Sequence, residues 1–123
     1  WHEWPLLGSN SDYAARAALA ADRQGAYVQF HKRLMRSSFV PTEEFLRALA
    51  ESIGIEPNTM ITDIKSEAVT SRLVASAALA SVFQFRGTPA LIVGRTVVVG
   101  AVSDATLKAL ISRERADGPL EMC

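Results

Sequence analysis

Few residues of this chain are of a type that could carry out chemistry, and they lie far apart. The histidines are His2 and His31, and the single cysteine, Cys123, is the last residue. Metal sites need several His, Cys, Asp or Glu ligands that converge, and this spacing predicts none. We expect His2 at the surface and His31 partly buried with one hydrogen-bond partner. A lone thiol cannot close an internal disulfide, so Cys123 is expected to be an inert tail residue, with an intermolecular disulfide or a reactive thiol as alternatives.

Other catalytic patterns are missing from the sequence as well. Glu43 and Glu44 are adjacent, but neighbouring helical residues point in different directions, so we expect a solvated helix start and not a carboxylate pair. The sequence contains no Gly-x-Ser-x-Gly nucleophile turn and no glycine-rich phosphate loop. No complete active site is therefore predicted within the chain, and no cofactor or metal is expected.

One stretch near the C-terminal end stands out by its turn residues. Two short apolar runs, residues 90–93 and 96–99, flank Gly94-Arg95, and this arrangement predicts a β-hairpin. Pro89 has no backbone N–H to donate to a β-ladder, so we expect it at the start of the first strand and not within it. An X-Pro linkage is also the one place where a cis bond is cheap, although the base rate alone favours trans.

Composition and charge are those of an ordinary globular protein. The 123 residues are 49% hydrophobic and 21% charged, with 13 basic and 13 acidic side chains. A chain of this length predicts one domain. The balanced charge, without a block of like charges, gives no indication of binding to nucleic acid or to an anionic membrane. No apolar run is long enough to span a bilayer. No secretory signal pattern is visible. Because the chain opens on Trp1 without an initiator methionine, we expect a processed or truncated product.

The coarse pattern along the chain predicts a strand, about five helices, the hairpin and a final helix. Residues 1–7 alternate as in a short strand ending at Pro5, and the region from 9 to 82 is helical almost throughout. Ser9–Asp12, Thr42, Ser66 and Ser103 are the expected N-caps, Pro57 is an expected first helical residue, and Gly54 an expected stop. An amphipathic stripe is predicted at Tyr27, Phe30, His31, Leu34 and Met35.

The order of these features resembles the DsbA-like thioredoxin domain family, most of all its Com1-like thiol:disulfide oxidoreductases. The resemblance covers residues 1 to about 115. It rests on Glu3-Trp4-Pro5-Leu6-Leu7-Gly8, the alanine-rich helix after it, Phe30-His31, Leu34-Met35, Arg86-Gly87-Thr88-Pro89-Ala90, and Gly100-Ala101-Val102 before the last helix. It implies an α/β, incomplete thioredoxin-like fold with a multi-helix insertion at about 9–84. The hairpin and terminal helix would occupy about 88–115, and 116–123 would be a loose tail.

The resemblance also implies a binding site. Thr88-Pro89 would form the family's cis-proline loop, and Gly87, Thr88 and Pro89 would pair with an extended segment of a protein substrate by strand addition. Arg86 would help to shape the approach to the loop.

The departure from the family is the missing Cys-x-x-Cys, together with the strand and helix that carry it. Cys123 matches no family cysteine, so the resemblance gives no catalytic residue in this chain and implies that these 123 residues are redox-inactive. The missing strand would be the central one, between the strand of His2–Trp4 and that of Ala90–Val93. Its loss would leave open edges, so we expect self-association or a complementing N-terminal segment.

Three functions remain open. The chain is expected to be part of a thiol:disulfide oxidoreductase that acts on exported proteins in the periplasm or cell envelope. The alternatives are a non-catalytic peptide-binding or oligomerisation module, and a protein similar to glutathione-dependent isomerases or kappa-class transferases.

Overall fold

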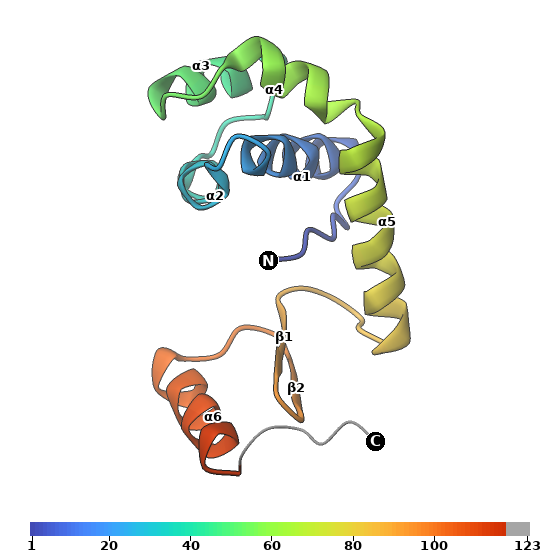
Figure 1. The fold of residues 1–123 in the computed structure, drawn as a ribbon, viewed down its shortest axis with the longest axis vertical. Coiled ribbons are helices and arrows are strands. Elements are labelled where there is room, and N and C mark those ends of the chain that lie inside the picture. Colours follow the sequence, from blue (N-terminus) through green and yellow to red (C-terminus); the bar gives the residue numbers. More distant parts are fainter. Residues whose placement is uncertain (118–123) are drawn as a thin grey trace. The chain divides into compact units, whose positions relative to one another are not determined.

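The computed structural model describes residues 1–117, which form six helices and a two-stranded sheet (Figure 1). The elements follow the expected order: α1 (Ser9–Asp22), α2 (Tyr27–Arg36), α3 (Glu43–Ser52), α4 (Pro57–Ile64), α5 (Glu67–Val82), β1 (Ala90–Val93), β2 (Thr96–Val99) and α6 (Asp104–Asp117). The expected helical block followed by a hairpin and a terminal helix is confirmed. The chain divides into two compact units, Trp1–Leu79 and the residues from Ala80 onward, so that the boundary falls within α5.

The first unit is built around the alanine-rich helix α1. This helix packs against α2 and α4, and α3 packs against α4. Alanine favours the helix and its small side chain lets neighbouring helices approach closely. Six consecutive or near-consecutive positions of α1 are buried: Ala15, Ala17, Ala18, Leu19, Ala20 and Ala21. Larger side chains from the other helices fill the space around them, the most completely buried being Phe30, Leu46, Met60 and Val69.

Most of the predicted helix starts are confirmed by side-chain caps. The hydroxyl of Thr42 accepts a hydrogen bond from the Phe45 N–H at 3.2 Å, and Ser66 and Ser103 cap α5 and α6 in the same way. The prediction for α1 was wrong, because its N-cap position is Gly8 and no side chain caps it. Gly8 turns the chain with a φ of 87°, a conformation that glycine adopts freely, so Ser9 is already helical.

Three helices end in the same manner, with a left-handed residue followed by a backbone bond across five residues. The left-handed positions are Gly25, Gly54 and Gln84, with φ of 75°, 81° and 56°. After Gln84, the Phe85 N–H donates to the Ala80 carbonyl at 2.9 Å, which closes the last turn of α5 as in a Schellman motif. This turn sets the direction in which the chain leaves α5 toward Pro89.

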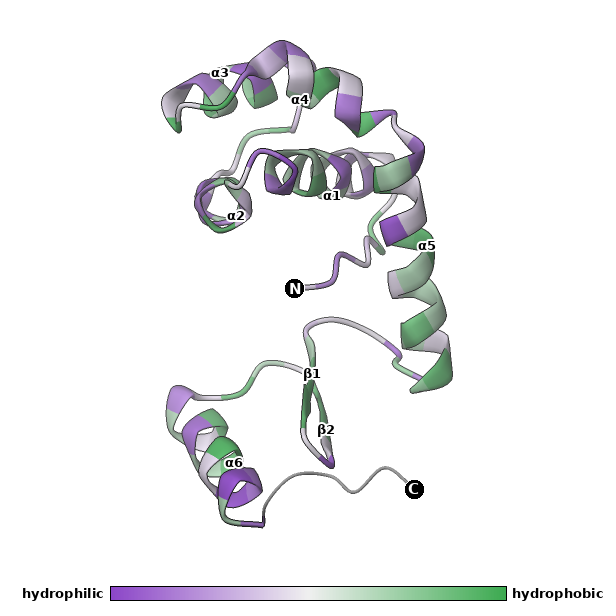
Figure 2. Ribbon diagram, in the orientation of Figure 1, coloured by the Kyte–Doolittle hydropathy of each residue, from purple (hydrophilic) through white to green (hydrophobic). Residues whose placement is uncertain are grey.

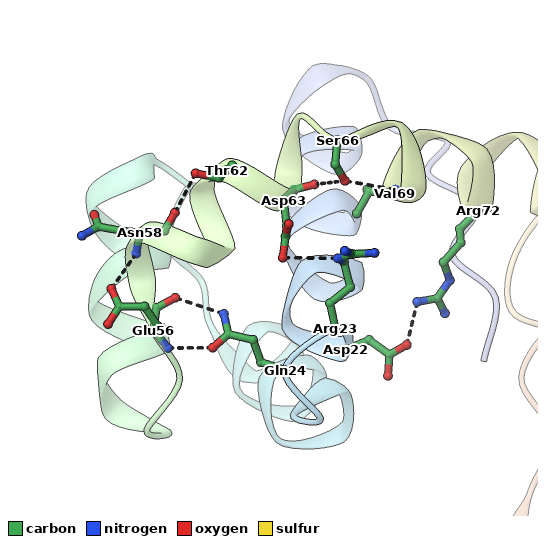
Figure 3. Close-up of polar contacts among 10 residues, drawn as sticks. All are labelled: Asp22, Arg23, Gln24, Glu56, Asn58, Thr62, Asp63, Ser66, Val69 and Arg72. Carbon is green, nitrogen blue, oxygen red and sulfur yellow. Dashed lines mark hydrogen bonds and ion pairs between the residues drawn. The ribbon is translucent and has the colours of Figure 1, made fainter.

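Polar contacts join the C-terminal end of α1 to α4 and α5 (Figure 3). Three consecutive residues, 22–24, each have a partner about 30 to 50 positions further along the chain. Arg72 donates to Asp22 at 2.6 Å, Arg23 pairs with Asp63 at 3.3 Å, and the Gln24 amide bonds both backbone groups of Glu56 at 2.8 and 3.0 Å. These contacts hold both ends of α4 and the first half of α5 against α1.

The strand predicted for residues 1–7 is wrong, because the structure forms no strand there. An extended segment becomes a strand only when its backbone groups pair with a neighbour. None of residues 1–117 pairs with the backbone of this segment, which is held instead by side chains. Its alternation of side chains is real, but alternation alone does not supply a partner.

The second unit contains the hairpin and α6. Strands β1 and β2 pair antiparallel, with Ala90 opposite Val99 and Val93 opposite Thr96, so Gly94-Arg95 is the predicted two-residue turn. Helix α6 packs against β1 and runs to Asp117, two residues beyond the expected end. The remainder of the predicted tail, including Cys123, lies outside the described residues.

Candidate functional site

The candidate site is the loop that joins α5 to β1. On either side of the turn residue Gln84, the rings of Phe83 and Phe85 stack with centroids 5.6 Å apart and an angle of 15° between their planes. The chain then passes through Arg86, Gly87 and Thr88 before it enters β1. Arg86, Thr88 and Pro89 are exposed, so the loop presents itself to solvent in this chain.

The proline stands where the sequence placed it. The Thr88–Pro89 peptide bond is cis, as the resemblance implied. The Pro89 carbonyl accepts a hydrogen bond from the Gly100 N–H at 2.7 Å, one step beyond the Ala90–Val99 pair of the ladder. The backbone acceptor of Pro89 is therefore used by the hairpin itself.

Unlike Pro89, the three residues before it have backbone groups that the hairpin does not use. Among residues 1–117, the backbone groups of Arg86, Gly87 and Thr88 make no hydrogen bond to another residue. Backbone N–H and C=O groups are strong hydrogen-bonding groups, and unpaired ones next to a strand are a template for an added strand. The loop can thus accept an extended peptide through its main chain.

A contact from α6 supports the other end of the hairpin. The Arg95 N–H donates to the Glu114 carboxylate at 2.9 Å, directly at the turn. Gly94 has a φ of 57°, and a Cβ at this position would collide with the same carboxylate. Glycine suits this position mainly because of its positive φ, and a larger residue would also have to displace the Glu114 side chain. Sequence reasoning found the turn but gave no signal for Glu114.

The two histidines and Glu43, which were also considered for chemistry, belong to the first unit, where each has contacts of its own. The imidazole of His2 lies 3.5 Å from the Ser76 hydroxyl, and Glu43 pairs with Arg47 at 3.0 Å in the first turn of α3. Among residues 1–117, no three His, Cys, Asp or Glu side chains are placed to hold a metal ion. In that same part of the chain, no helix has the length and apolar character needed to cross a membrane.

Sequence reasoning missed a polar cluster that the segment before α1 forms with α2. The Tyr27 hydroxyl donates to the Glu3 carboxylate, and His31 Nδ1 lies 3.8 Å from the same carboxylate. Burial raises the pKa of Tyr27, and its hydrogen bond to the charged Glu3 raises it further. The sequence did indicate that Trp1 and Glu3 lie on one side of the extended segment before α1. It did not indicate that this side contacts Tyr27 and His31 of α2.

Solved structures with a similar fold cover nearly the whole chain. No curated protein matches it. A thioredoxin-like oxidoreductase from Silicibacter pomeroyi DSS-3 is 38% identical with a TM-score of 0.86, over 94% of this chain and 66% of that one. The thiol-disulfide exchange protein alpha-DsbA2 from Wolbachia pipientis is 27% identical with a TM-score of 0.83, over 91% and 62%.

A periplasmic thioredoxin-like protein from Salmonella enterica serovar Typhimurium is also 27% identical, with a TM-score of 0.76 over 90% of this chain and 62% of that one. The chain thus spans about two thirds or less of the length of these relatives. The model of the DSBA-like thioredoxin domain matches residues 3–112, which include the helical block, the cis-proline loop and most of α6. The chain therefore belongs to the DSBA-like thioredoxin domain family.

Proposed function

We propose that this chain is the substrate-binding part of a thiol-disulfide oxidoreductase, and that the loop Gly87-Thr88-Pro89 binds an extended segment of a protein substrate. The observation that carries the proposal is the unpaired backbone of Thr88, an exposed residue two positions before the start of β1. An added peptide would gain main-chain hydrogen bonds there without any rearrangement of the hairpin. The similarity to proteins described as thiol-disulfide exchange and periplasmic proteins supports this class of function and a place in the cell envelope.

The proposal includes redox inactivity of these 123 residues. Disulfide exchange proceeds through a mixed disulfide that a second thiol resolves, and the sequence contains one cysteine and no Cys-x-x-Cys. Full turnover would need a Cys-x-x-Cys supplied by another segment. Holding an extended peptide requires no thiol, so the binding function stands independently of the redox function.

The binding proposal is tested by titrating the chain with an acetylated, amidated peptide of alternating Val and Thr around a central S-methylcysteine, followed by amide NMR. We expect the Thr88 and Ala90 signals to shift. Thr88→Pro removes the Thr88 N–H and should weaken binding about tenfold or more, the effect of losing one well-made hydrogen bond of about 1.5 kcal/mol.

The matched control is Thr88→Ala, which removes the hydroxyl but keeps the N–H and should bind as the unaltered chain does. Slow exchange of the Gly100 amide, which bonds the Pro89 carbonyl, verifies that the hairpin is intact in both variants. Equal binding by both variants, or no shift at Thr88, would remove the loop from the proposal.

Redox inactivity is checked in the same samples by insulin reduction with dithiothreitol. The chain and its Cys123→Ser variant should both leave the rate at that of dithiothreitol alone. Acceleration that depends on Cys123 would overturn the redox part and leave the peptide result standing.

We also propose that a further strand, from a second copy or a complementing segment, covers the open hairpin. Both strands are edge strands, and Figure 2 shows that they are largely hydrophobic. The side chains of Ile92, Val97 and Val99 are 43%, 44% and 56% exposed. Isolated two-stranded sheets are marginally stable, so a partner strand adds stability. Sedimentation velocity should show association at rising concentration. Val97→Lys with Val99→Lys should abolish it, whereas Val74→Lys, at an α5 side chain that is 63% exposed, should not. A strictly monomeric chain would overturn pairing with a second copy.

A further inference from the structure

The first unit carries a second feature, which the peptide loop does not explain. It is a hollow of about 390 Å³ formed by the first residue and one face of α2. Volumes of this order are typical of sites for small organic ligands. Its lining combines aromatic, apolar and basic side chains: Trp1, Val28, His31, Lys32, Met35 and Arg36.

The helical spacing explains why these side chains gather. Val28, Lys32, Met35 and Arg36 stand at i, i+4, i+7 and i+8 and therefore share one face of α2. Met35 belongs to the predicted amphipathic stripe, but it is 72% exposed, so its prediction as part of a buried face was wrong. Val28 is 46% exposed and Trp1 is 79% exposed. Large apolar groups are thus left in water directly beside cations.

The charge of this face has one sign. Helix α2, from Tyr27 to Arg36, contains no acidic residue. Within the described part of the chain, Lys32 and Arg36 form no ion pair. Glu3, the acidic side chain beside the hollow, does not line it, because its carboxylate is turned to the Tyr27 hydroxyl and to His31.

An aromatic wall is fixed by the same Glu3 cluster. The ring of His31 stacks on Tyr27 with centroids 5.5 Å apart, and the indole of Trp1 lies 5.0 Å from His31. Tyr27 is buried and bonded to Glu3, so His31 packs against a rigid neighbour. A flat ligand can lie against such rings, and Met35 can adapt to its shape.

We propose that this hollow binds a small anion with an aromatic or apolar body, its carboxylate at Lys32 and Arg36 and its body against Trp1, His31 and Met35. Guanidinium and ammonium groups bind carboxylates through charge-assisted hydrogen bonds, and the apolar lining buries the remainder of such a ligand. The volume favours a small molecule over a long peptide segment. This inference concerns a separate site and does not depend on the proposed peptide loop.

The test is titration of the full chain with 2-naphthoate, monitored by the indole N–H of Trp1 and the amides of α2. We expect saturable shifts at these positions and binding about tenfold weaker for uncharged 2-naphthamide, as one lost charge-assisted bond predicts. Arg36→Glu should also weaken naphthoate binding about tenfold or more. Arg33→Glu is the matched control, because it makes the same charge change on the same helix outside the hollow.

Any of the following results would overturn the proposal: no saturable shift at Trp1, equal binding of naphthoate and naphthamide, or equal losses in Arg36→Glu and Arg33→Glu. An acetylated Glu-Phe-Glu-Leu amide is titrated in parallel. Tighter binding of this peptide than of naphthoate at the same positions would overturn the assignment to a small molecule. Circular dichroism of each variant verifies that the helices persist.

Discussion

Replacing Phe30 with alanine is expected to lower the free energy of unfolding of the first unit by about 3–5 kcal/mol, the usual cost of truncating a buried phenylalanine. Phe30 is fully buried and is the largest of the completely buried side chains. Its removal leaves a cavity among helices that already use small alanines to approach each other, so little nearby bulk is available to fill it. A unit of this size has a total stability of about 4–12 kcal/mol, so the loss is a large part of it.

Urea denaturation followed by helical circular dichroism measures this loss. Phe39→Ala is the control, because it makes the same chemical change at a side chain that is 74% exposed and touches Phe45 at a ring distance of 5.7 Å. We expect it to cost less than about 1 kcal/mol. Similar losses in the two variants would show that the burial of Phe30 does not hold the first unit together.

The residues that could be predicted from the sequence are those whose structure depends on near neighbours. A cap such as Thr42 and a turn such as Gly94-Arg95 act over two to four positions, and both are found as expected. The helical periodicity of α2 also correctly predicted that Tyr27 and Phe30 are buried. The same periodicity wrongly placed Met35 in the buried face. Helical periodicity shows which side chains share a face of the helix, but not how much of that face a neighbouring element covers.

Contacts between distant residues could not be predicted in this way. The bond of Tyr27 to Glu3 joins positions 24 apart, and that of Arg95 to Glu114 joins positions 19 apart. The strand expected at residues 1–7 depended on a partner that the pattern itself could not supply. For the candidate site, the sequence pointed to Pro89 through a family resemblance. The unpaired backbone of Thr88 became visible only once the ladder of β1 and β2 was known.

Tyr27 is expected to make stability fall at alkaline pH, by up to about 1.4 kcal/mol for each pH unit above about 10. Its pKa in the folded chain is raised above the ordinary value of 10.0, first by burial and then by the hydrogen bond to Glu3. Below pH 10 the hydroxyl keeps its proton in both states, so the contribution of the bond is fully present. Above pH 10 the unfolded chain loses this proton first and binds fewer protons than the folded chain, so rising pH favours unfolding.

Tyr27→Phe separates this effect from other groups that titrate at high pH. At neutral pH the variant should be less stable by about 1.5–3 kcal/mol, because it loses a hydrogen bond to a charged acceptor. The difference from the unaltered chain should then shrink as the pH rises above 10, since phenylalanine has no proton to lose.

Tyr13, whose pKa is also raised by burial and by Glu43, is present in both proteins and cancels from their difference. Urea denaturation at a series of pH values from 7 upward measures the two curves. Parallel curves over the whole range would mean that Tyr27 does not keep its proton beside Glu3. The segment before α1 would then be held by the packing of Trp1 against His31, and not by the Tyr27–Glu3 bond.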